Sequence, residues 1–102
     1  MARPTEQIAK AAERGLRLRK EFERGGTPVG VARARDLSNR KEIPKKTLNR
    51  IISFLERHQK NYKPGKKESD GGPTPGTIAY LLWGGPAALR WAKREVKKLE
   101  RD

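Results

Sequence analysis

The chain has 102 residues, enough for one domain with a limited core. It carries 25 Lys and Arg against 12 Asp and Glu, a formal net charge of +13, which favours polyanionic partners: nucleic acid ahead of an acidic membrane or an acidic protein. The absence of cysteine excludes disulfides and cysteine-ligated metals. Since no apolar run approaches roughly 18 residues and M-A-R-P-T-E-Q is no signal peptide, we expect a soluble protein inside a cell or virus particle.

Residues 5–24 predict a first helix. Apolar and small residues recur three and four apart, which lines them along one stripe, and the charged residues between them form a solvated face. The stripe consists of Ile8, Ala11, Gly15, Leu18 and Phe22. Pro4 or Thr5 fits the start of this helix, and Gly25-Gly26 fits its end.

Residues 27–38 predict a second, shorter helix. Thr27 is suited to cap it and Pro28 to occupy its first position, where no N–H is missed. The inward positions are Val31, Ala34 and Leu37. Arg33 and Arg35 diverge by about 200° around the axis, so at most one of them can face a flat partner squarely.

A third helix follows the turn 38–43. Asn39 in the turn tolerates left-handed backbone, and Pro44 is expected at the first helical position. The strongest apolar face of the chain follows, formed by Leu48, Ile51, Ile52 and Leu55, while the outer face carries Lys45, Lys46, Asn49, Arg50, Ser53 and Arg57. Helix, short turn and basic helix resemble a helix-turn-helix entering a DNA major groove, although any two-helix hairpin of a basic protein has this pattern.

The stretch that follows the third helix changes character. His58, the only histidine, lacks metal-ligating companions, so we interpret it as a capping or surface residue. Residues 60–73 are rich in Pro, Gly and Lys and predict a loop. This loop is either a plain solvated linker or a segment that follows a phosphate backbone, with Tyr62 available to stack on a base.

Two further helices are predicted at 75–83 and 86–101. Thr74-Pro75 repeats the Thr-Pro start, and Gly84-Gly85-Pro86 predicts a tight corner that folds both helices over the third. Trp83 and Trp91 are expected to close the core, with stacking on nucleobases as the alternative. A basic stripe follows the last helix at spacings of four, three and four: Arg90, Arg94, Lys97 and Arg101.

Three blocks of the sequence resemble one family. G-G-T-P-V-G-V-A-R-A-R-D-L-S-N-R, T-L-N-R-I-I-S-F-L-E-R-H-Q and P-T-P-G-T-I-A-Y-L-L-W-G-G-P are similar to a small domain of phage and prophage genomes. That domain occurs alone or attached to head-morphogenesis or portal-type proteins. Its pattern has Glu where this chain has Gln59, and Asp where it has Pro86, so a site built on those acids is altered here. The resemblance implies a phage origin rather than a particular activity.

The sequence therefore predicts one all-α domain over residues 1–102. We expect a compact bundle of about five short helices, with N-terminal helices in 5–59 that include a helix-turn-helix-like pair at 28–58, a loop at 60–73 and C-terminal helices in 74–102. No phosphate-cradling motif and no nucleophile with a histidine partner is present, and salt bridges account for Asp36 and Glu56. We predict no enzyme, no cofactor and no metal.

Three functions remain open from the sequence. The first is binding of nucleic acid, DNA preferred, through phosphate contacts with or without groove readout. The second is a virion or head-assembly component that docks on packaged DNA or on an acidic capsid or portal protein; the third is an inhibitor of a host nucleic-acid enzyme. The expected location is the cytoplasm of an infected or lysogenic bacterial host, or the virion. The predicted nucleic-acid-binding residues are Arg33, Arg35, Arg40, Lys41, Lys45, Lys46, Asn49, Arg50, Arg57, Arg90, Arg94, Lys97 and Arg101.

Overall fold

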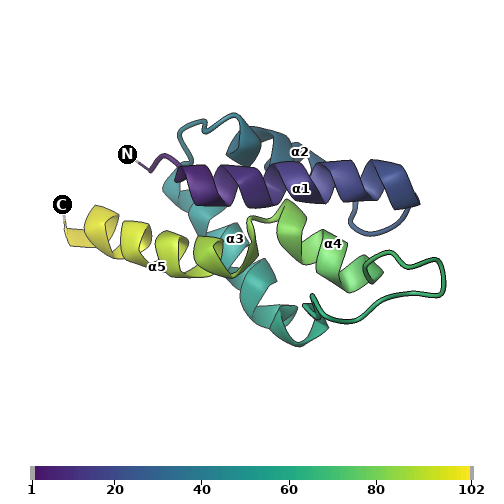
Figure 1. Cartoon of the computed structure of the whole chain (residues 1–102). Helices are drawn as coiled ribbons and strands as arrows, with labels where there is room; N and C mark the ends of the chain where they lie inside the picture. The colour runs from purple at the N-terminus through teal and green to yellow at the C-terminus, as the bar shows by residue number, and fades with distance from the viewer. Residues whose placement is uncertain (1, 102) are drawn as a thin grey trace.

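The computed structural model describes residues 2–101, and this part of the chain is all-α, as predicted (Figure 1). Its α-helices are α1 (Glu6–Phe22), α2 (Pro28–Ser38), α3 (Lys45–Arg57), α4 (Pro75–Leu82) and α5 (Gly85–Arg101), and a short 3-10 helix, η1 (Gln59–Asn61), follows α3. The molecule is elongated, with principal extents of 49 × 25 × 21 Å. The C-terminal end of α5 projects from the bundle (Figure 1).

Three helices begin at a threonine cap. The hydroxyls of Thr5, Thr27 and Thr74 accept hydrogen bonds from the N–H three residues later, at 3.3, 3.2 and 3.1 Å. Each cap satisfies an N–H that has no partner inside the helix. The Thr-Pro prediction for α2 and α4 is thus confirmed, whereas at α3 the prediction was wrong by one position: Pro44 is the cap and Lys45 the first helical residue.

Two charged residues adopt left-handed backbone where helices end. Glu23 has φ 52° after α1, ahead of Gly25 and Gly26, which also have positive φ. Between α2 and α3 the left-handed residue is Arg40, with φ 52°, and not Asn39, which has φ −86°. Asn39 instead continues the helical hydrogen bonding, since its N–H donates to the carbonyl of Arg35.

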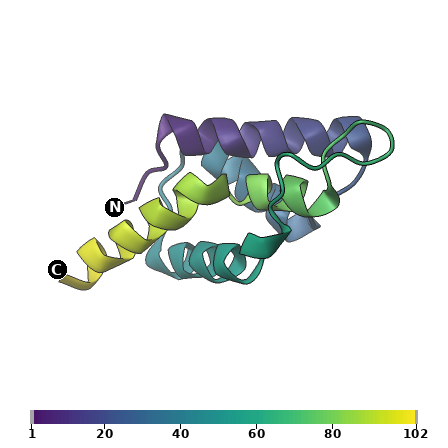
Figure 2. The same cartoon turned by 60° about the horizontal axis from the view of Figure 1, so that its bottom comes forward.

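The helices form three layers. α1 and α2 pack against each other on one side, α3 lies on the other, and α4 and α5 run between them (Figures 1 and 2). α4 packs mainly on α1, and α5 packs mainly on α3. The expectation that both C-terminal helices lie over α3 therefore holds only for α5.

The helix-turn-helix-like pair at 28–58 does not pack as one. Both helices form, but α2 has its main contacts with α1, and α3 has its main contacts with α5. The indole of Trp83 lies between them: Phe54 of α3 stacks on it at 4.5 Å, and the guanidinium of Arg33 of α2 lies 5.5 Å from its centroid. A helix-turn-helix packs its two helices directly across a turn of about three or four residues, so the prediction of this motif was wrong.

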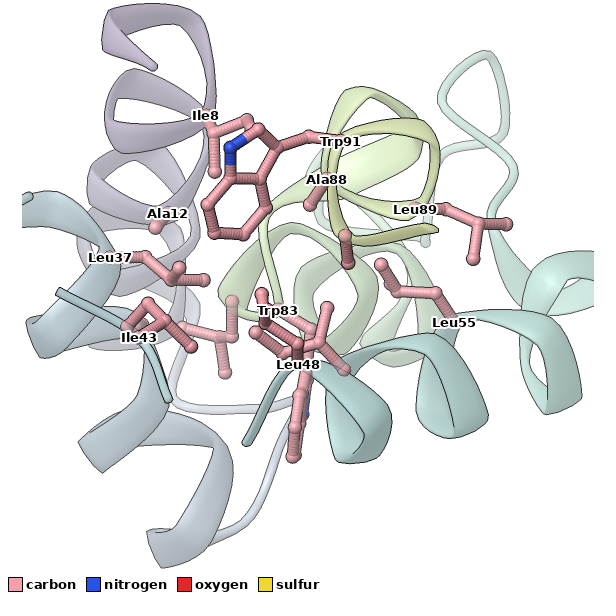
Figure 3. Packing of buried hydrophobic residues seen from close by; sticks show 14 of the residues in the cluster. Ile8, Ala12, Leu37, Ile43, Leu48, Leu55, Trp83, Ala88, Leu89 and Trp91 are labelled. Atoms are coloured by element: carbon pink, nitrogen blue, oxygen red, sulfur yellow. The ribbon is translucent and has the colours of Figure 1, made fainter. Parts of the chain in front are cut away.

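The core joins all five helices. Trp83 and Trp91 are 7% and 4% exposed, which confirms their predicted core role. Figure 3 shows Trp91 beside Ile8 of α1, and Leu89 of α5 facing Leu55 of α3. The buried residues of α1 are Ile8, Ala9, Ala12 and Gly15, so its inward stripe is rotated from the predicted one, in which Ala11, Leu18 and Phe22 are only half-buried.

The predicted loop is an anchored segment rather than a free linker. Arg24, just after α1, forms a bidentate ion pair with Asp70 at 2.8 and 2.9 Å and donates to the carbonyl of Pro73. At the other end, the N–H of Lys63 donates to the Thr77 hydroxyl of α4 at 2.9 Å. The Tyr62 ring, predicted to be available to a base, stacks on Tyr80 at 4.9 Å.

A close contact between α1 and α4 at Gly15 provides the first test. A Cβ at Gly15 would lie 2.8 Å from the backbone nitrogen of Leu82 and 3.0 Å from the carbonyl carbon of Leu81. Alanine favours a helix over glycine by about 1 kcal/mol, but here backbone atoms must move. We expect Gly15→Ala to lower the free energy of unfolding by about 1–3 kcal/mol in urea titrations. Gly65→Ala, where a Cβ meets nothing within 4 Å, is the matched control; a stabilised Gly15→Ala protein contradicts the close contact.

The Arg24–Asp70 pair provides the second test. Hydrogen bonds from Arg24 and from the Gly72 N–H hold the pKa of Asp70 below its usual range. A lowered pKa in the folded state means that the anchor stabilises the loop above about pH 4, the ordinary Asp pKa, and is lost as the pH falls below it. We expect Asp70→Asn to increase tryptic cleavage after Lys66 and Lys67 at pH 8 severalfold. Glu68→Gln is the control, and equal cleavage of the two variants contradicts the anchor.

Candidate nucleic-acid interface

The pairing of α3 with α5 positions most of the predicted basic residues. Lys45, the first residue of α3, forms an ion pair with Glu100 near the end of α5 at 3.6 Å. Glu56 near the end of α3 forms one with Lys93 in the middle of α5 at 2.8 Å. The two helices are therefore antiparallel, as Figure 2 also shows. All four side chains are about half-exposed, so these ion pairs contribute little stability.

The exposed cations of α3 and α5 lie on the same side of this helix pair. On α5, Leu89 and Lys93 face α3 while Ala88 and Ala92 face the core. At about 100° per residue, the stripe Arg90, Arg94, Lys97 and Arg101 then lies opposite the core. The same rotation of about 100° per residue, counted from the buried residues of α3, places five exposed residues opposite the core: Lys46, Asn49, Arg50, Ser53 and Arg57. We call these nine exposed residues the α3–α5 face.

The acids of α3 and α5 do not neutralise this face. These two helices contain ten Lys and Arg and three acids, Glu56, Glu95 and Glu100. Each acid pairs with a lysine outside the face: Lys93, Lys98 and Lys45 respectively. Among residues 2–101, none of the four cations of the α5 stripe forms an ion pair. Within the part of the chain that the structure describes, the stripe therefore presents positive charge without an ion-pair partner.

Several of the predicted binding residues already have partners. Lys41 pairs with Asp36 at 3.7 Å, and Arg40 donates from Nε to the carbonyl of Pro4 at 2.8 Å. Lys45 is paired with Glu100, and Arg57 donates from Nε to the carbonyl of Ser53 at 3.2 Å. Arg35 is exposed but belongs to α2, in the layer that packs on α1.

Arg33 serves packing rather than an exposed surface. Its side chain is only 14% exposed, lies over Trp83 and pairs with Asp36 at 3.8 Å. Its Nε is buried without a hydrogen-bond partner in the described part of the chain. These contacts give Arg33 a packing role, and its low exposure makes it a poor candidate for a phosphate contact.

Sequence reasoning missed a second basic site, a groove between α1 and the corner that joins α4 to α5. Lys10 and Arg14 of α1 and Arg90 of α5 line it, together with Gln7 and Tyr62. The groove has a volume of about 430 Å³, and no acid is among its lining residues. The spacing of residues 7, 10 and 14 places them on one helix face, but only the fold brings that face to Arg90. We call this site the α1–α5 groove.

The other predictions of chemistry concern His58, catalysis and the membrane. His58 caps the end of α3, and its ring lies 4.4 Å from that of Phe54, which confirms the capping interpretation. Asp36 and Glu56 each pair with cations, as expected. Within residues 2–101 no three His, Cys, Asp or Glu side chains form a group able to hold a metal ion, and no helix there has the length and apolarity to cross a bilayer.

In comparisons with known proteins, no family model, no curated protein and no solved structure matches this chain.

The role of Arg33 provides the third test. Arg33→Met removes a cation–π contact worth about 0.5–1 kcal/mol, but it also removes a buried N–H without a partner, which costs about 1–3 kcal/mol. We expect the free energy of unfolding to stay within about 1 kcal/mol of the wild-type value or to rise, and duplex DNA affinity to change less than about twofold. Arg50→Met, on the exposed side of α3, is the control and should weaken binding several times more. A folded Arg33→Met protein with a tenfold loss of affinity contradicts the packing role.

Proposed function

We propose that this protein binds double-stranded DNA through phosphate contacts made by the α3–α5 face. The observation that carries the proposal is the α5 stripe, four exposed cations on one side of a helix whose acids are paired elsewhere. From Arg90 to Arg101 the stripe spans about 16 Å, at 1.5 Å per residue. Measured along the axis of a duplex, at about 3.4 Å per phosphate of one strand, this length covers about five phosphates. Phosphate neutralisation by Lys and Arg is the main source of affinity that does not depend on sequence.

Base readout is a secondary part of this proposal. Lys46, Asn49 and Arg50 are exposed on α3, and their side chains offer the donors and the amide that read base edges in a major groove. However, α2 does not pack beside α3 as the first helix of a helix-turn-helix would. We therefore assign affinity to phosphate contacts from both α3 and α5. Contacts with base edges in the DNA major groove are assigned to α3 alone.

A phage role is the second candidate, favoured by the resemblance of the three sequence blocks to the phage domain. In a virion the α3–α5 face would dock on packaged DNA or on an acidic surface of a capsid or portal protein. The same cations serve either partner, because exposed positive charge attracts any polyanion. Digestion of purified particles with DNase separates the two partners, since only a protein-bound copy stays at a fixed number per particle.

The fourth test is charge reversal on the stripe. We expect the double variant Arg94→Glu/Lys97→Glu to lose at least tenfold in affinity for a blunt duplex at 100 mM salt, measured by fluorescence anisotropy. The slope of log K against log salt should fall by about 2, because two phosphate contacts are removed.

The matched control for this test is Lys20→Glu, an exposed lysine in the last turn of α1, at the other end of the long axis (Figure 1). It removes one positive charge and adds a negative one, so a purely global charge effect acts on it as well. An equal loss per reversed charge in the control would falsify the localised interface. Circular dichroism spectra establish that both variants are folded.

A further inference from the structure

We propose that the α1–α5 groove binds an unpaired nucleotide of a DNA strand that continues beyond the duplex on the α3–α5 face. The choice of DNA rests on the function proposed above, whereas the nucleotide chemistry rests on the groove itself. This cavity combines three cations, an aromatic ring and an apolar wall. Its volume of about 430 Å³ lies in the range of small-ligand sites.

Three cations from two helices converge on the groove. Lys10 and Arg14 are one turn apart on α1, and Arg90 approaches from α5. All three are exposed, and none forms an ion pair with any of residues 2–101. A concave site lined by one sign of charge concentrates its field on a bound counter-ion. Gln7 adds a neutral hydrogen-bonding group on the same face of α1. This donor set matches a phosphate with its sugar.

The remaining lining is suited to a base. Tyr62 lies at the groove, and Ala11, Leu81, Pro86 and Ala87 supply apolar contact. The position of Tyr62 is fixed: its ring stacks on the buried Tyr80, and its N–H donates to the carbonyl of Gln59 at 3.2 Å. The next N–H, of Lys63, is held by the Thr77 hydroxyl. An aromatic side chain held beside cations is the combination with which proteins bind single strands without sequence preference.

The corner between α4 and α5 leaves this space open. Gly84 and Gly85 have φ of 102° and 73°, a region that L side chains rarely adopt. A Cβ at Gly85 would lie 3.7 Å from the Cβ of Ala11, both residues being part of the groove lining. Glycine at this position therefore serves the turn and keeps a side chain out of the site.

Arg90 connects the groove to the proposed duplex interface. It is the first residue of the α5 stripe and also part of the groove lining. A strand whose phosphates follow the stripe towards the start of α5 consequently arrives at the groove. The occupant that this continuity favours is the unpaired end of the bound strand. A free nucleotide has the same chemistry and is the other source of such a ligand.

The fifth test compares a blunt 16-base-pair duplex with the same duplex carrying a four-thymidine overhang. We expect the wild-type protein to bind the overhang substrate at least fivefold more tightly. Arg14→Glu and Lys10→Glu, separately, should abolish this preference and leave blunt-duplex affinity within about twofold. Lys20→Glu is the matched control on the same helix and should retain the preference. Absence of a preference in the wild-type protein, or its persistence in both groove variants, overturns the proposal.

Two further experiments distinguish a DNA overhang from a free nucleotide as the ligand, and distinguish the groove proposal from the proposed duplex function. Excess thymidine monophosphate should remove the overhang preference without displacing the blunt duplex; if inorganic phosphate competes equally well, the aromatic part of the site is wrong and the nucleotide assignment fails. Arg94→Glu/Lys97→Glu tests the duplex face alone. If the blunt duplex never binds but single strands bind in an Arg14-dependent manner, the proposed duplex function fails and the groove remains.

Discussion

The architecture depends on the contact between α1 and the end of α4, where residue 15 has no side chain. The backbones approach so closely there that a Cβ would lie 2.8 Å from the Leu82 nitrogen. This contact lets α4 pack on α1. Trp83, the residue after α4, then lies between α2 and α3. The glycine corner then turns the chain into α5, whose Trp91 packs beside Ile8 (Figure 3). One close backbone contact thus positions α4, and the corner that follows leads the chain into α5, which packs mainly on α3.

Placing α5 in the middle layer has an electrostatic consequence. One side of α5 faces the core and another faces α3, so its polar residues divide into two sets. Lys93 pairs with Glu56 of α3, and Glu100 pairs with Lys45 of α3. The α5 stripe instead lies opposite the core, and Arg90 at its start also lines the α1–α5 groove. Because all three acids of α3 and α5 pair with lysines outside the α3–α5 face, the seven Lys and Arg of that face keep their positive charge on one side of the helix pair. A concentrated field steers a polyanion to that side more effectively than the same charge spread evenly.

Local features of the fold were predictable from the sequence, and the packing partners were not. Thr27-Pro28 and Thr74-Pro75 identify two helix starts because capping and the fixed φ of proline act within a few residues. The spacing of Leu48, Ile51 and Leu55 likewise identifies the inward side of α3. Periodicity does not identify which helix packs on that side. The sequence therefore predicts that α2 pairs with α3, whereas in the structure Trp83 lies between these two helices. Trp83 was recognised as a core residue, but its contact with the guanidinium of Arg33 joins residues fifty positions apart, which no local pattern encodes.

Because local patterns do not identify packing partners, the sequence predicts the basic stripe of α5 but not the α1–α5 groove. The stripe lies on one helix, so its geometry follows from residue spacing alone. The groove needs Arg90 beside Lys10 and Arg14, and this proximity exists because the glycine corner brings the start of α5 to α1. Charge alone makes a surface that binds any polyanion with affinity falling steeply as salt rises. In the proposed site, Tyr62 and the apolar wall would add discrimination, because contacts with them require an unstacked base, which a continuous duplex does not offer. In the complex that we propose, Arg90 belongs to both sites, so the face and the groove would act on one strand. The junction between paired and unpaired DNA would then engage both sites together.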